Sequence, residues 1–179
     1  MSLVPARIII AMGVASSGKS VTGKSIARRL HAPFLDGDTY HPVANKEKMR
    51  AGIPLVDDDR WPWLSTLAHA LRDAADTKGV AVGACSALKR SYRDHLVKEA
   101  GEPILFVFLD GSEELIASRM AARNHEYMPS ALLGSQFATL EVPQPDENFV
   151  AVPVTLSVEA IADRVAKLVP HLKSFKRKQ

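Results

Sequence analysis

The sequence predicts a three-layer α/β/α fold in which a five-stranded parallel sheet lies between helices. Five short apolar runs, bounded by turn residues, alternate along the chain with segments of helical period. The runs are mostly continuous rather than alternating, which is typical of strands buried on both faces of a parallel sheet. Strands and helices in this order are joined by right-handed crossovers, so the sheet is expected to be doubly wound.

The apolar runs and the periodic segments locate the elements. Strands are expected at residues 7–12, 33–36, 80–85, 104–110 and 149–154. Helices are expected at residues 19–30, about 43–50, about 60–76, about 89–99, 112–123 and 130–141. A final helix begins at Val158, and its apolar residues recur at helical spacing, so one face should cover the sheet.

Two segments interrupt this alternation, although the chain, residues 1–179, is most simply one domain. Residues 37–62 form an insertion rich in charge, Pro and Gly, and residues 124–135 begin with a break between helical stretches. In an open α/β sheet the ligand binds beyond the carboxyl ends of the strands. The first segment is therefore expected to bind substrate, and the second is expected to form a helical lid.

Composition excludes several classes of protein. Hydrophobic residues make up 46% and charged residues 24% of the chain, as in a globular domain and unlike a disordered or fibrous protein. No apolar run approaches the ~18 residues of a membrane-spanning helix, so no membrane partner is expected. The single cysteine, Cys85, excludes an internal disulfide and a multi-cysteine metal site. These features predict a soluble cytoplasmic protein.

The net charge of +3 does not indicate a nucleic-acid-binding protein. Four positive charges lie in the last seven residues, KSFKRKQ, and the rest of the chain has a net charge of about −1. Nucleic-acid binding requires a basic stripe with interleaved aromatic residues, and only Phe175 lies in this tail. The tail is therefore interpreted as a solvated terminus.

Residues 13–20 read GVASSGKS, which satisfies the pattern G-x-x-x-x-G-K-[ST] between an expected strand and an expected helix. Such a loop points successive N–H groups at a phosphate, and the dipole of the following helix adds to the attraction. Lys19 would supply charge to the β- and γ-phosphates, and Ser20 would bind Mg²⁺. The motif predicts a bound nucleoside triphosphate and leaves the acceptor open. The expected contacts are Gly13, Ser16, Ser17, Gly18, Lys19, Ser20 and Val21.

The second expected strand ends in LDGD, which brings Asp36 and Asp38 to the mouth of the phosphate loop. Carboxylates two residues apart on an extended chain point the same way. One can hold a Mg²⁺-bound water while the other accepts the proton of a substrate hydroxyl. The pair could instead cap the following turn, and that interpretation stays open at this point.

Basic side chains follow this pair of carboxylates. Hydrogen-bond donors beside a catalytic carboxylate suit an acceptor molecule that carries hydroxyls and an anionic group. At least two of the three residues Asp57, Asp58 and Asp59 are interpreted as a helix start, and Cys85 as a small buried side chain. The candidate donors are His41, Lys48, Arg50, Arg60, Lys89 and Arg93.

Arg119 and Arg123 lie four residues apart, so they share one helix face directly before the segment NHEYMP. Beside a lid they could stack on the nucleotide base and clamp its phosphates, and Arg123 could neutralise charge as the γ-phosphoryl group moves. On an ordinary surface helix the same two arginines would be solvated, so both interpretations stay open here.

Four segments, in order from about Arg7 to Glu141, carry a combined pattern: GVASSGKS, FLDGDTYHPVANKEKMRAGIPLVDDDRWPWL, CSALKRSYRD and QFATLE. The phosphate loop is common to many families, whereas D-G-D-x-x-H-P-x-x-N-x-x-K-M with P-L-x-D-x-D-R-x-P-W-L is highly specific. Together the segments closely resemble the gluconate kinases (gluconokinases) of the small P-loop kinase type. The resemblance implies a nucleoside-monophosphate-kinase-like P-loop kinase fold and a homodimer.

The resemblance also implies transfer of the ATP γ-phosphate to the 6-hydroxyl of D-gluconate, with Mg²⁺ as cofactor. Asp38 would be the base, Asp36 would lie near Mg²⁺ with Ser20, and Lys19 and Arg123 would complete the catalytic set. Arg119 and Arg123 would face ATP. The implied gluconate contacts are Asp38, His41, Arg60, Lys89, Arg93 and Gln136.

Two other functions are compatible with part of this pattern. A shikimate-kinase-like enzyme would share the phosphate loop, the aspartate pair and the lid. A non-catalytic nucleotide-binding or nucleic-acid-associated module has only the basic tail in its favour. Gluconate, a carboxylate with five hydroxyls, fits the mixed Asp, His, Lys and Arg set better than a nucleotide acceptor, since no aromatic stacking slot is evident.

Overall fold

A computed structural model describes residues 3–122 and 130–169 of the chain. The strands are β1 Ile8–Met12, β2 Phe34–Asp36, β3 Ala81–Ala84, β4 Ile104–Asp110 and β5 Phe149–Pro153. The helices are α1 Lys19–Leu30, α2 Val43–Arg50, α3 Asp57–Lys78, α4 Arg90–Ala100, α5 Glu113–Ala122, α6 Ser130–Thr139 and α7 Val158–Leu168, with a 3-10 helix, η1, at Gly37–Tyr40.

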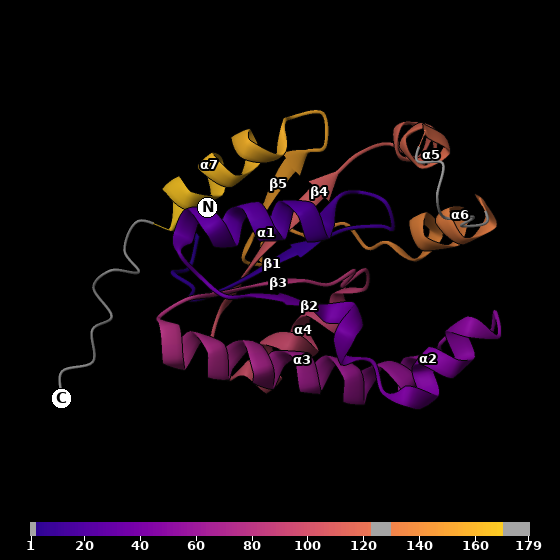
Figure 1. Ribbon diagram of the computed structural model, residues 1–179, viewed down its shortest axis with the longest axis horizontal. Helices are drawn as coiled ribbons and strands as arrows, with labels where there is room; N and C mark the ends of the chain where they lie inside the picture. Colours follow the sequence, from indigo (N-terminus) through magenta and orange to yellow (C-terminus); the bar gives the residue numbers. More distant parts are fainter. Residues whose placement is uncertain (1–2, 123–129, 170–179) are drawn as a thin grey trace.

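The five strands form one parallel sheet in the order β2-β3-β1-β4-β5 (Figure 1). Strand β1 lies at its centre, with Ile9 opposite Val82 of β3 and Leu105 of β4. All five residues of β1 are buried, as are all four of β3. The predicted five-stranded parallel sheet is therefore confirmed, and its central strands are apolar on both faces because both faces are covered.

Helices cover the sheet in two layers, α1 and α7 on one face and α3 and α4 on the other (Figure 1). A hydrophobic core lies on each face of the sheet, and alternate residues of β1 pack into one core or the other. Ile9 packs in the cluster that includes Ile26 of α1 and Val165 of α7, whereas Ile8 and Ile10 pack with the leucines of α3 and with Leu96 of α4. The predicted three-layer fold follows from this alternation of side chains along the strand.

The final helix, α7, behaves as its pattern predicts. Ser157 accepts a hydrogen bond from Ala160 N at 3.1 Å and so caps the helix start. Ile161, Ala162 and Val165 are buried against the sheet and α1. The helix is described to Leu168, and the last part of the expected apolar stripe lies outside the described residues.

Helix α3 begins earlier than the sequence indicates. It starts at Asp57, not near Arg60, because a carboxylate oxygen of Asp59 accepts Val56 N at 3.0 Å and stabilises an additional first turn. Pro62 is consequently inside the helix, where it removes one backbone hydrogen bond. The expected acidic helix start is present, shifted toward the N-terminus.

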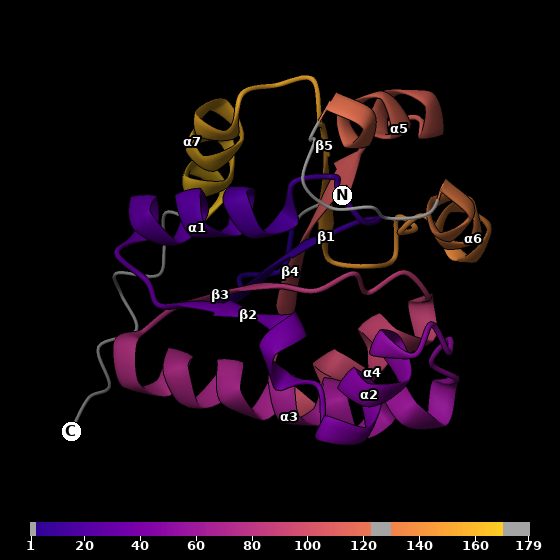
Figure 2. The same cartoon turned by 45° about the vertical axis from the view of Figure 1, so that its right-hand side comes forward.

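All five strands point their carboxyl ends toward the same edge of the sheet, called here the carboxyl edge. Beyond it, α5 and α6 lie on one side and α2 on the other, in both Figure 1 and Figure 2. Parallel sheets of this kind bind their ligands at that edge. Within the described ranges, no helix is both long and apolar enough to cross a membrane.

Candidate active site

The phosphate loop joins β1 to α1 in a conformation that requires glycine. Gly13 has φ 145° and Gly18 has φ 96°, both in the range that L side chains rarely adopt. A Cβ at Gly13 would also lie 3.2 Å from Leu109 O of the neighbouring strand. The loop can therefore approach β4 closely and present its backbone N–H groups at the start of α1.

Lys19 lies folded onto this loop. Its Nζ donates to Val14 O at 2.8 Å, which holds the ammonium against the loop. Burial lowers the pKa of Lys19, and the nearby Asp38, Cys85 and Asp36 oppose that shift. A cation partly removed from water interacts strongly with any anion that replaces its carbonyl partner.

Cys85 and Ser17 are two other buried side chains near the phosphate loop, and they differ in their capacity to contact a ligand. Burial raises the pKa of Cys85 to about 12, so its side chain is a neutral thiol and not a nucleophile. Ser17 Oγ is the one buried polar side-chain atom of the described residues without a hydrogen-bond partner. A phosphate oxygen in the loop would be a suitable partner for such an atom.

Asp36 joins the end of β2 to the first turn of α1. Its Oδ2 accepts a hydrogen bond from Ser20 Oγ at 2.9 Å. Its Oδ1 accepts Asp38 N at 3.2 Å, which makes Asp36 the cap of η1. The two hard oxygen ligands predicted for Mg²⁺, on Ser20 and Asp36, are thus adjacent.

The sequence predicted that Asp38 lies on extended chain, but it lies in η1. Strand β2 ends at Asp36 and the backbone turns at once into η1, so the expectation that both carboxylates point the same way on a strand is wrong. The turn occurs because Asp36 satisfies the Asp38 amide. A Cβ at Gly37 would lie 2.4 Å from Ala84 O, so only glycine allows this segment to approach β3.

His41 is buried directly after η1, with 8% of its surface exposed. Its ring stacks on the indole of Trp63, with ring centroids 3.9 Å apart and planes 19° apart. Trp63 Nε1 in turn donates to Gly37 O at 2.7 Å. Burial lowers the pKa of His41; Asp38 opposes that shift, and Arg60 and Lys46 add to it.

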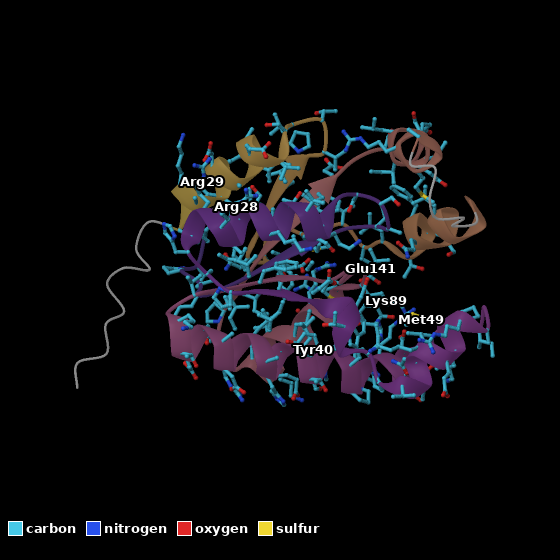
Figure 3. All side chains as sticks on the ribbon, in the orientation of Figure 1. Arg28, Arg29, Tyr40, Met49, Lys89 and Glu141 are labelled. Carbon is cyan, nitrogen blue, oxygen red and sulfur yellow. The ribbon has the colours of Figure 1, made fainter. Side chains whose placement is uncertain are left out.

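Arg60 and Lys89 meet at the starts of α3 and α4, around Tyr92. Lys89 Nζ donates to both carboxylate oxygens of Asp57, at 3.0 and 2.9 Å. Tyr92 Oη donates to Asp57 at 2.5 Å and accepts from Arg60 at 3.4 Å. This group, Asp57, Arg60, Lys89 and Tyr92, is called here the cationic cluster, because two cations outnumber its one carboxylate. Figure 3 shows Lys89 at the carboxyl edge.

Lys48 and Arg50 are not part of the cationic cluster. Lys48 donates to both oxygens of Asp59, at 2.7 and 2.9 Å, and so joins α2 to the start of α3. Arg50 is exposed at the last position of α2. Both residues were candidate donors because they follow the aspartate pair in sequence, and the partner observed for Lys48 is Asp59.

Arg93 is buried and fully engaged with protein groups. Its guanidinium donates to Glu147 at 2.5 and 2.9 Å and to the carbonyl oxygens of Ala87 and Leu88 at 3.0 and 3.2 Å. Only 1% of its side-chain surface is exposed. Its observed contacts are therefore with Glu147 and with the loop that joins β3 to α4.

Gln136 of α6 contacts the phosphate loop. Its Oε1 accepts a hydrogen bond from Ala15 N at 2.6 Å. Arg119 of α5 donates to Val154 O at 2.7 Å. Arg123, and the segment NHEYMP that follows it, lie outside the described residues.

The fold thus brings Lys19, Ser20, Asp36 and Asp38 to one place, with His41 packed beside η1. The sequence did not identify three residues that contact the predicted site residues: Asp57, Tyr92 and Glu147. Local sequence does not show which side chain on a distant segment will be the partner of a given residue. The spacing of Lys89 and Tyr92 by three residues on one helix was the available signal for Tyr92. Among the described residues, no group of three or more His, Cys, Asp or Glu could hold a metal ion.

Comparison with known proteins relates this arrangement to characterised families. The family described as AAA domain matches residues 8–143. The thermoresistant gluconokinase of Escherichia coli is 45% identical over 145 residues, which cover 81% of this chain and 82% of that protein. The gluconokinase of Gluconobacter oxydans is 45% identical over 152 residues, which cover 85% of this chain and 84% of that protein.

Solved structures agree with these sequence comparisons. The crystal structure of a gluconokinase from Sinorhizobium meliloti superposes with a TM-score of 0.81 at 44% identity, covering 92% of this chain and 91% of that one. The chain therefore belongs to the gluconokinase family, within the AAA domain family whose pattern it matches.

Proposed function

We propose that this protein is a gluconokinase, which transfers the γ-phosphate of ATP to the 6-hydroxyl of D-gluconate and releases 6-phospho-D-gluconate and ADP. The observation that carries the proposal is the hydrogen bond between Ser20 and Asp36. It joins the nucleotide loop to the segment that holds Asp38 and His41. A donor site and an acceptor site therefore share one edge of the sheet, as phosphoryl transfer requires.

The nucleotide binds along the phosphate loop. Its phosphates accept hydrogen bonds from backbone N–H groups of the phosphate loop. Lys19 Nζ releases Val14 O and binds phosphate oxygens instead. Ser20 and Asp36 supply the hard oxygen ligands for Mg²⁺, a set that fits an ion which keeps several waters. When bound, Mg²⁺ neutralises charge on the phosphates.

Asp38 acts as the general base toward the 6-hydroxyl. Its backbone is held by Asp36 on one side, and the adjacent Gly37 carbonyl is held by Trp63. A carboxylate fixed in this way can accept a proton as the hydroxyl oxygen attacks. His41 contacts the substrate beside it.

The carboxylate of gluconate binds at the cationic cluster. Arg60 and Lys89 come from two different helices, and Asp57 offsets only one of their two charges. The remaining positive charge suits one anionic group.

Arg93 and Gln136 were expected to contact gluconate, and we propose indirect roles for both. Arg93 fixes the carbonyl oxygens of Ala87 and Leu88, directly before Lys89. Gln136 fixes Ala15 of the phosphate loop. Both residues then position a group that contacts a ligand.

Residues 37–62 form the acceptor-binding insertion and residues 124–135 the lid in this proposal. Arg119 and Arg123 face ATP from the lid side, with Arg123 stabilising charge during transfer. Arg119 would exchange Val154 O for the nucleotide. Replacement of Arg123 by alanine should lower kcat/KM, and an unchanged value would remove it from the mechanism.

A coupled ATP assay with gluconate, shikimate and no acceptor tests the proposed reaction. Turnover that requires gluconate is expected. Turnover only with shikimate, or turnover independent of acceptor, would contradict it. The names of the relatives do not favour the shikimate-kinase-like alternative.

The proposal includes a homodimer in the cytoplasm. Its support is the family resemblance and a single buried free cysteine, which needs no oxidising compartment. Light scattering of the purified protein, with and without ATP, measures the dimer directly. A monomer in both conditions would contradict that part.

A further inference from the structure

Asn45 is the last residue of the pattern D-G-D-x-x-H-P-x-x-N, which begins at Asp36. It lies in the first half of α2, with 4% of its surface exposed. Its Nδ2 donates to Asp59 O at 2.8 Å and lies 3.3 Å from His41 Nδ1. A buried amide with two such partners constrains both of them.

The orientation of this amide follows from its partner on α3. A backbone carbonyl oxygen can only accept, so the atom of Asn45 that faces Asp59 O must be the nitrogen. That same nitrogen carries only donors, so the ring nitrogen that faces it must accept. His41 Nδ1 is therefore unprotonated, and the proton of the neutral imidazole is on Nε2.

The rest of the surroundings hold the ring in place and keep it neutral. Trp63 stacks on one face of the imidazole. The charged groups that act on His41 are Asp38 of η1, Lys46 of α2 and Arg60 of α3. Two of these three are cations, and burial also disfavours an imidazolium.

We infer that Asn45 is a positioning residue that fixes the tautomer of His41, so that His41 Nε2–H donates to an oxygen of gluconate. This inference rests on the proposed function for the identity of the ligand. Asp38 can only accept and His41, in this tautomer, can only donate through Nε2. The two side chains together then distinguish substrate oxygens by their role in a hydrogen bond.

Histidine side-chain ¹⁵N NMR of the protein without substrate tests the tautomer itself. The His41 signals are identified by their loss in His41→Gln. We expect Nε2 protonated and Nδ1 unprotonated at neutral pH. A proton on Nδ1, or an imidazolium at neutral pH, would overturn the inference, and this measurement does not depend on gluconate being the substrate.

Asn45→Asp tests the role of the amide, because a carboxylate of equal size accepts from Nδ1–H. The pKa of His41 should rise, and above that pKa the proton of the neutral imidazole should be on Nδ1. At such a pH KM for gluconate should increase about tenfold while KM for ATP is unchanged. The control is Glu47→Gln, at an exposed position of the same helix. An unchanged tautomer and KM in Asn45→Asp would contradict the inference, whereas absence of any gluconate turnover in the wild type would contradict the proposed function instead.

Discussion

Ser20 Oγ and Asp36 Oδ2 lie 2.9 Å apart, in one hydrogen bond between the first turn of α1 and the last residue of β2. In sequence the two residues belong to different motifs, one for the nucleotide and one for the acceptor. In space the bond makes them a single site. The order of strands explains why the two residues meet. Only β3 lies between β2 and β1 in the sheet, and the chain turns into η1 directly after β2.

Separate roles for the two aspartates can be tested by single substitutions. Asp38→Asn removes the proposed base and should lower kcat by a factor of about 10² to 10⁴, with little change in KM for ATP. Asp36→Asn should instead raise the Mg²⁺ concentration that gives half-maximal rate. Steady-state kinetics over a range of Mg²⁺ measure both effects.

The control for these variants is Asp58→Asn, at an exposed position in the first turn of α3. It should leave kcat and the Mg²⁺ dependence unchanged. If Asp36→Asn lost turnover at all Mg²⁺ concentrations while Asp38→Asn remained active, the two proposed roles would be exchanged.

Lys89→Met tests where the carboxylate of gluconate binds. The substitution keeps much of the side-chain length and removes the charge that Asp57 and Tyr92 surround. KM for gluconate should rise at least about tenfold, since a hydrogen bond to a charged group is lost, and KM for ATP should not change.

Lys98→Met, on an exposed position of the same helix, is the matched control. Higher salt should raise KM for gluconate less in Lys89→Met than in the wild type, because the screened charge is already missing. Equal changes of KM in the two lysine variants would argue against a carboxylate site at the cationic cluster.

Much of the fold could be predicted because burial on two faces leaves a simple mark, a continuous apolar run. The phosphate loop was equally local, since its glycines, Lys19 and Ser20 are adjacent in sequence. The hydrophobic pattern and the local motifs did not predict which polar side chains form hydrogen bonds or ion pairs with one another. Lys89 and Asp57 are 32 residues apart, Arg93 and Glu147 are 54 apart, and Gln136 and Ala15 are 121 apart.

The same limit explains the errors of local detail. The turn at η1 depends on a hydrogen bond from Asp38 N to the Asp36 side chain. The early start of α3 depends on Asp59. A short polar side chain ends a strand in the first place and extends a helix in the second, and hydrophobic periodicity records neither effect.

Gln136→Leu separates a nucleotide role from a gluconate role. The substitution removes the acceptor for Ala15 N and retains side-chain volume. If Gln136 positions the phosphate loop, KM for ATP should rise several-fold, about the effect of one neutral hydrogen bond, and KM for gluconate should stay constant. The reverse result, with only gluconate affected, would return Gln136 to the substrate contacts that the family resemblance implies.

Glu147→Gln tests the buried ion pair with Arg93, whose side chains are 6% and 1% exposed. Removing one charge leaves the other buried without a counter-ion, and we expect a loss of about 3 kcal/mol in the free energy of unfolding. For a chain of this length that corresponds to a decrease in Tm of roughly 6–12 °C. Differential scanning calorimetry measures it.

The pair at Arg90 and Asp146 provides the matched control for this ion pair. It is adjacent in sequence to Glu147 but exposed, with 43% and 59% of the side-chain surfaces accessible, so Asp146→Asn should change Tm little. Equal decreases in the two variants would show that burial does not determine the contribution of the Arg93 pair.

Acid stability gives a second measurement of the same ion pair. Burial alone raises the pKa of Glu147, but the hydrogen bonds from Arg93 and Gln144 N outweigh it and hold the pKa below its ordinary value of 4.5. Because the folded pKa is the lower one, this stabilisation is present above pH 4.5 and is lost as the pH falls through the folded value. The free energy of unfolding, measured by urea titration at successive pH values, should therefore fall less steeply below pH 4.5 in Glu147→Gln than in the wild type. Parallel pH profiles in the two proteins would mean that Glu147 has the same proton affinity folded and unfolded.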